Sequence, residues 1–129
     1  MLVPAPQPLK FRRGMRLKHG RDFSRIRAEG ERRACGCLIL NWRLLSPGSV
    51  PRVGVVTSGR IGNAVVRARA RRLMREVFRL HQHDLNQPLD IVLVARASIV
   101  GKAFADVERD FVTTLRQKKL LKQTPSQPA

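Results

Sequence analysis

Apolar and polar residues are patterned most clearly between residues 60 and 80, where apolar positions recur at helical spacing. An α-helix turns by about 100° per residue, so positions spaced alternately by four and three residues share one face. The apolar positions with this spacing are Val66, Ala70, Leu73, Val77 and Leu80. The positions expected on the opposite side are arginines: Arg67, Arg71, Arg72, Arg75 and Arg79. We therefore predict an amphipathic helix with a cationic face, capped by Asn63.

Shorter patterns predict the remaining elements. Residues 20–30 predict a short helix that ends at Gly30. Residues 38–42 and 52–57 predict two strands, and the turn residues at 46–49 lead us to expect an antiparallel hairpin.

The C-terminal half adds one strand and one helix. The unbroken apolar run at 91–95 predicts a central strand that is buried on both faces. Residues 103–118 predict a last helix, with Phe104, Val107, Phe111 and Leu115 spaced for burial. Helix, strands, helix, strand, helix is an order typical of a small α/β (α+β) sandwich.

Composition and charge indicate that the protein binds a polyanion. The 129 residues suit a single domain, and 26 Lys+Arg against 9 Asp+Glu give a formal net charge of +17. Such an excess favours nucleic acid or an anionic membrane surface as partner. A solvated helix face usually mixes charge signs, so a face of arginines is best explained by a polyanion. The chain has no apolar run near the ~20 residues of a membrane span, and its Pro-rich start is a poor secretion signal, so we expect a cytoplasmic protein.

Motifs for catalysis by the protein itself are absent from the sequence. It shows no nucleophile elbow, no paired carboxylates at a candidate cleft and no phosphate-binding glycine loop. Cys35 and Cys37 are too few and too close for a zinc site, and we expect reduced, partly buried thiols. A binding protein without catalytic residues or a metal site of its own is therefore expected.

The run from Arg60 to Glu76 resembles the signature of the bacterial ribonuclease P protein component. In that signature Gly-x-Ala-Val precedes Arg-Asn-Arg and then x-(Lys/Arg)-Arg-x-x-Arg. Residues 52–58 resemble the strand before the signature and residues 90–96 the strand after it, and the resemblance extends over residues 16–118. We therefore expect one RNA-binding domain at 10–122, between disordered tails at 1–9 and 123–129.

The resemblance implies a fold and an activity. The implied fold is a small mixed sheet of about four strands with three helices, in the order α-β-β-β-α-β-α. Its βαβ crossover is left-handed, against the usual right-handed rule. Family members bind a catalytic RNA and the 5′ leader of precursor tRNA, and that RNA removes the leader with Mg²⁺. The resemblance thus implies Mg²⁺ bound mainly by the RNA, no catalytic residue in the protein, and a protein that is monomeric apart from its RNA.

The resemblance also implies two groups of site residues. Those matched to catalytic-RNA contacts are Arg67, Ala68, Arg69, Arg71, Arg72 and Arg75. Those matched to the leader-binding cleft are Lys18, Phe23, Arg27, Arg60 and Arg96.

Three positions depart from the family pattern. Ala68 stands where an asparagine is usual, and Arg27 where a second cleft aromatic is common. Asn41 stands where another aromatic is expected, unless Trp42 replaces it through a register change. We therefore expect a less aromatic, more electrostatic cleft, with unusually salt-sensitive leader binding.

Alternatives remain at this point. The chain could be another small basic RNA-binding protein of ribosomal type. A membrane-active protein would need an exposed apolar face opposite the charge. Phe23 could be a core residue instead of a leader contact, and Trp42 is expected to pack more than to stack.

Overall fold

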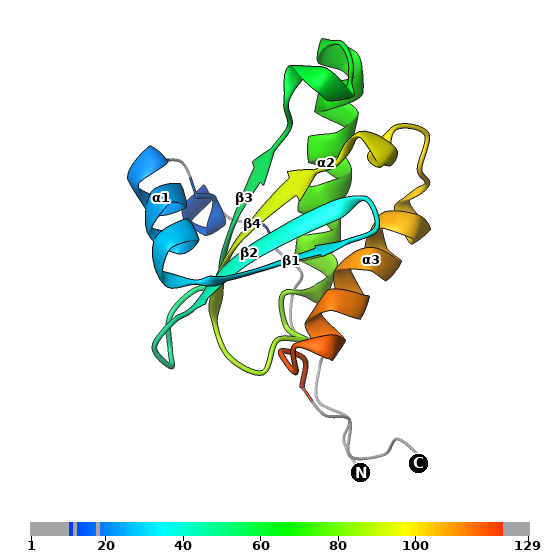
Figure 1. Ribbon diagram of the computed structural model, residues 1–129. Helices are drawn as coiled ribbons and strands as arrows, with labels where there is room; N and C mark the ends of the chain where they lie inside the picture. Colours follow the sequence, from blue (N-terminus) through cyan, green and yellow to red (C-terminus); the bar gives the residue numbers. More distant parts are fainter. Residues whose placement is uncertain (1–10, 12, 18, 123–129) are drawn as a thin grey trace, which may run out of the picture.

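The computed structural model describes residues 11, 13–17 and 19–122 (Figure 1). The predicted tails at 1–9 and 123–129 and the site residue Lys18 lie outside the described residues. The helices and strands are, in order, α1 (Gly20–Glu29), β1 (Glu31–Cys35), β2 (Leu38–Leu44), β3 (Arg52–Val56), α2 (Ala64–His81), β4 (Leu89–Ala95) and α3 (Phe104–Gln117). Three 3-10 turns complete the order: η1 (Arg13–Met15), η2 (Gly59–Ile61) and η3 (Ala97–Ile99). This order confirms the α-β-β-β-α-β-α arrangement and the four-stranded sheet.

The sheet is mixed, with the strand order β1-β2-β4-β3. β2 runs antiparallel to both β1 and β4, whereas β3 runs parallel to β4. α2 is thus the crossover between two adjacent parallel strands; the left-handedness of that crossover stays a prediction.

The predicted hairpin between residues 38–42 and 52–57 is wrong, because β4 lies between these two strands. The antiparallel hairpin partner of β2 is β1, and Gly36 makes the turn between them at a φ of 57°. A glycine suits that left-handed conformation. β1 has no apolar alternation because its first four residues are exposed, so periodicity could not reveal it.

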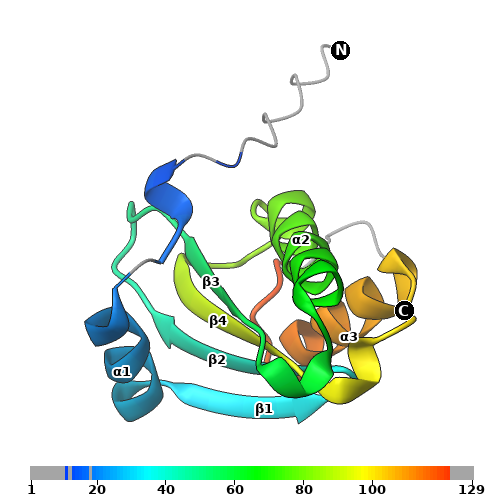
Figure 2. The ribbon, with the colours of Figure 1, turned by 90° about the horizontal axis from the view of Figure 1, so that it is seen from above.

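Helices cover both faces of the sheet, as Figure 2 shows from above. α2 and α3 lie over one face and bury the main core, to which the alternate β4 residues Ile91 and Leu93 belong. α1 lies over the other face, where Leu17, Ile26 and Val92 form a second cluster. β4 is therefore buried on both faces, as predicted.

α2 begins as predicted, since Asn63 Oδ1 accepts a hydrogen bond from the Val66 backbone N–H at 3.0 Å. Its buried stripe differs from the prediction. Ala70, Met74, Val77 and Phe78 are buried, whereas Leu73 and Leu80 are only partly buried. The stripe is rotated because α2 contacts α3 as well as the sheet. The first turns of α2 rise beyond the ends of β3 and β4 (Figure 1).

The burial of this stripe removes the exposed apolar face that a membrane-bound helix would need. Within residues 11, 13–17 and 19–122, none of the helices has the length and hydropathy to cross a membrane.

Candidate RNA-binding surface

The arginines of α2 lie on two flanks of the helix. Arg71 turns toward β3, where its Nη1 donates to Thr57 Oγ1 at 2.7 Å. Arg69 turns toward α3, and its Nη2 donates to the Lys102 backbone carbonyl at 2.7 Å. These two hydrogen bonds hold guanidinium groups on both sides of the helix. The cationic surface is therefore broader than the single face that was predicted, and we call this surface of α2 the arginine ridge.

The other predicted contacts complete this ridge. Arg67 lies beside Gly59 at the start of η2, where an added Cβ would stand 3.5 Å from Arg67 Nη1. Ala68 is partly exposed and Arg72 is exposed. Arg75 is partly buried, and its pKa lies below the ordinary arginine value through burial and through the positive charges of Arg16 and Arg71.

The one acid of this helix is neutralised within α2. Arg79 Nε donates to Glu76 Oε2 at 3.0 Å, and a second bond joins Arg79 Nη2 to Glu76 Oε1. Arg79 thereby holds the pKa of Glu76 below its usual range. Since Glu76 is engaged by Arg79, the ridge keeps a strong positive field.

Phe23 lies on the other face of the sheet, where α1 packs. A Cβ added at Gly54 would stand 2.6 Å from Phe23 Cζ, so the ring end rests directly on the β3 backbone. Phe23 packs against the second cluster yet stays partly exposed. The geometry therefore gives Phe23 a packed end and an accessible part; its role as a leader contact stays a prediction.

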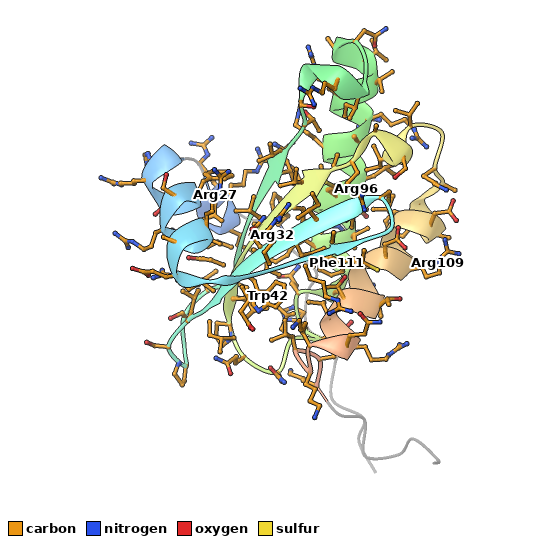
Figure 3. All side chains as sticks on the ribbon, viewed as in Figure 1. Arg27, Arg32, Trp42, Arg96, Arg109 and Phe111 are labelled. Carbon is orange, nitrogen blue, oxygen red and sulfur yellow. The ribbon has the colours of Figure 1, made fainter. Side chains whose placement is uncertain are left out.

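The strand register decides which residues share this face with Phe23. Arg32 pairs with Asn41, and Asn41 pairs with Val92, whose side chain packs under α1. Asn41 therefore lies on the α1 face, whereas its neighbour Trp42 is 1% exposed in the main core. Trp42 packs, as expected, and does not replace the missing aromatic. Arg27 on α1, Arg32 on β1 and Trp42 on β2 are labelled in Figure 3.

Arg60 and Arg96 emerge from the same end of the sheet, because they follow the parallel strands β3 and β4. Arg60 is exposed in η2, and η2 contacts η3, which Arg96 precedes. Arg96 Nη1 donates to the Gly36 carbonyl at 3.2 Å, which ties this residue to the β1–β2 turn (Figure 3).

An ion network that the sequence did not indicate connects α1 to the sheet. Asp90 is 1% exposed, and both its oxygens accept bonds from Arg52, each at 2.8 Å. This pairing raises the pKa of Arg52. Arg43 lies 3.5 Å from Asp90 and 3.1 Å from Glu29, the last residue of α1. The network joins the last residue of α1, the helix that carries Phe23, to the sheet. Its sequence signal is the aspartate directly before the predicted apolar strand at 91–95, and the structure includes this residue in β4.

No group of three or more His, Cys, Asp or Glu side chains in the described part of the chain is arranged to hold a metal ion. Burial and the Asp110 carboxylate raise the pKa of Cys37 to about 12, which keeps this sulfur protonated and a poor metal ligand.

Comparisons with known proteins agree with this geometry. The family model described as Ribonuclease P matches residues 11–119. The chain is 36% identical over 111 residues to the ribonuclease P protein component of Caldanaerobacter subterraneus subsp. tengcongensis, covering 85% of this chain and 89% of that protein. It is 32% identical over 117 residues to the component from Clostridioides difficile, covering 90% and 96%.

Solved structures show the same fold. The Staphylococcus aureus RNase P protein superposes with a TM-score of 0.74 at 25% identity, covering 84% of this chain and 98% of that one. The Thermotoga maritima RNase P protein gives a TM-score of 0.69 at 26% identity, covering 79% and 96%. The chain therefore belongs to the ribonuclease P protein family, the protein component of a ribonucleoprotein endoribonuclease of tRNA processing.

Proposed function

We propose that α2 binds the catalytic RNA of ribonuclease P, and that the α1 face of the sheet with its adjoining end binds the 5′ leader of precursor tRNA. The observation that carries this proposal is the ridge on α2, where Arg69 and Arg71 are anchored on opposite flanks and the one acid is paired. A ridge of this kind suits the phosphates of a folded RNA.

The leader contacts combine one aromatic with several guanidinium groups. The accessible part of Phe23 offers a surface for an unpaired base. Arg27, Arg60 and Arg96 offer phosphate contacts, and Lys18 joins them by its match to the family. Because Asn41 replaces an aromatic on this face, charge contributes more to leader binding here than stacking does.

The chemistry belongs to the RNA and to Mg²⁺ that the RNA binds. Arginine charge beside the RNA replaces part of the divalent screening and releases counterions, so the protein lowers the Mg²⁺ that cleavage requires. The protein acts in the cytoplasm, where it is monomeric apart from its RNA.

The test is cleavage of precursor tRNA by the cognate catalytic RNA at low millimolar Mg²⁺, with and without the protein. We expect cleavage at the mature 5′ end to depend on the protein under these conditions. Cleavage by the protein alone would contradict the absence of catalytic residues. Binding of RNA without stimulation would favour a general RNA-binding protein.

Two variants separate the surfaces. Arg71→Ala should weaken association with the catalytic RNA, whereas Phe23→Ala should lower the ratio of precursor to mature tRNA affinity. Arg116→Ala, at an exposed position near the end of α3, is the charge-matched control. If the affinity ratio survives Phe23→Ala, Phe23 is not a leader contact.

The salt dependence of leader affinity tests the electrostatic cleft. We expect the logarithm of the leader-binding constant to fall more steeply with the logarithm of the salt concentration than it does for a family member with cleft aromatics. An equal or shallower slope would count against an electrostatic cleft.

A further inference from the structure

Three arginines from two distant parts of the chain lie beside the edge strand β3. Arg71 and Arg75 come from successive turns of α2, on the flank that faces β3. Arg16 comes from the segment between η1 and α1, and it lies over the ring of Phe11, which packs edge-on against Phe78 of α2. The charges of Arg16 and Arg71 both lower the pKa of Arg75. The family signature contains the two α2 residues, whereas Arg16 lies outside it.

Backbone pairing holds Arg16 at this edge. Arg16 forms a parallel bridge with Val53, and the next backbone N–H, of Leu17, donates to the Val53 carbonyl at 2.9 Å. The Arg16 guanidinium lies over the Phe11 ring, 5.1 Å from its centroid. A guanidinium that stacks on a ring by its face keeps its N–H edges for acceptors. Arg16 is therefore oriented before any ligand arrives.

The α2 side of this cluster is equally constrained. The bond from Arg71 Nη1 to Thr57 Oγ1 sets the direction of that guanidinium at the end of β3. Arg75 is partly buried, so part of its hydration is lost, and the named charges that act on it are positive. Like charges brought together with partial desolvation destabilise a fold unless an anion neutralises them.

We propose that Arg16, Arg71 and Arg75 form one phosphate-binding site, which takes a backbone phosphate of the catalytic RNA. This inference rests on the proposed function of α2. It adds a contact from the segment before α1 and gives that segment a role separate from leader binding. A phosphate oxygen accepts several charge-assisted hydrogen bonds at once, which matches guanidinium groups that converge from two elements.

The experiment is titration of the cognate catalytic RNA with the protein at several salt concentrations. Arg16→Ala should weaken binding about tenfold and lower the slope of log K against log salt by about 0.7 to 1. Arg116→Ala removes the same charge at an exposed site on α3 and should leave the slope unchanged. Since the bridge to Val53 uses backbone atoms, Arg16→Ala should still fold, as cooperative thermal unfolding beside Arg116→Ala would show.

A double-mutant cycle tests whether the site is shared. If Arg16 and Arg75 bind one phosphate, the double alanine variant should lose less affinity than the product of the two single losses. The inference would be overturned if the affinity losses of the two single variants multiply fully, or if Arg16→Ala binds the RNA as Arg116→Ala does. In either case the proposed function would still stand if the wild-type protein stimulates cleavage. An effect of Arg16→Ala confined to precursor tRNA would overturn the assignment to the catalytic RNA. A wild-type protein that fails to bind the RNA would remove both proposals.

Discussion

Gly54→Ala should destabilise the protein through Phe23. The new Cβ would lie 2.6 Å from Phe23 Cζ and 2.8 Å from Cε1. Ordinary carbon contacts are about 3.5–4.0 Å, so the ring must shift by about 1 Å. Overpacking of this size costs about 1–3 kcal/mol, and replacing glycine within a strand returns about 0.5–1 kcal/mol. The two ranges leave a net loss of about 0 to 2.5 kcal/mol, so the free energy of unfolding should fall by about 1 kcal/mol in urea denaturation.

The effect should depend on the ring. Phe23→Leu lacks the two ring atoms that meet the Cβ, so in this background Gly54→Ala should be close to neutral. The remaining neighbour, Leu17 Cβ at 3.3 Å, needs to move only slightly. In the native background the displaced ring should also lower the preference for precursor over mature tRNA, with affinity for the catalytic RNA unchanged. An equal loss of stability in both backgrounds would refute this reasoning.

Three further substitutions or reactions test single features. Asp90→Ala should lower the free energy of unfolding by about 3 kcal/mol, because it leaves Arg52 without its buried partner; a loss below about 1 kcal/mol in urea denaturation would contradict this. Asn63→Ala should cost about 1 kcal/mol of stability through loss of the α2 cap, whereas Asn63→Asp should keep most of it; equal melting of the two variants would argue against the cap. Iodoacetamide at pH 8 should label the partly exposed Cys35 before Cys37, because a pKa near 12 keeps the Cys37 thiol protonated. Labelling of Cys37 should rise as the pH approaches 12. Equal labelling rates of the two cysteines at pH 8, measured by mass spectrometry, would contradict this.

Local signals in the sequence were sufficient for several elements. Asn63 before a 3.6-residue pattern located the start of α2, and the apolar run at 91–95 identified a strand buried on both faces. The helix at 20–30 and its end at Gly30 also agree with the structure. Each of these depends on neighbouring residues or on composition alone.

Long-range pairing was beyond such signals. β1 was not located because its residues are exposed, and the wrong hairpin followed from the assumption that consecutive strands pair. Periodicity placed the α2 arginines on one face, but it could not show that Arg69 reaches Lys102 before α3 and that Arg71 reaches Thr57 after β3. Arg16 joins the cluster only through its bridge to Val53, which has no counterpart in local sequence.

The position of β4 between β2 and β3 has a consequence for folding during synthesis. β4 is made after both of its neighbours, and the Arg52–Asp90 pair spans 38 residues. Contacts of such separation form late, because a long loop must first close. Until Leu89 and the residues after it leave the ribosome, the pairing of β1 with β2 is the only native strand pairing of the described sheet that can form. During that time β3 has no partner strand, because its neighbour in the sheet is β4. Completion of the sheet therefore brings β3, with the signature helix that follows it, into place in a single late step.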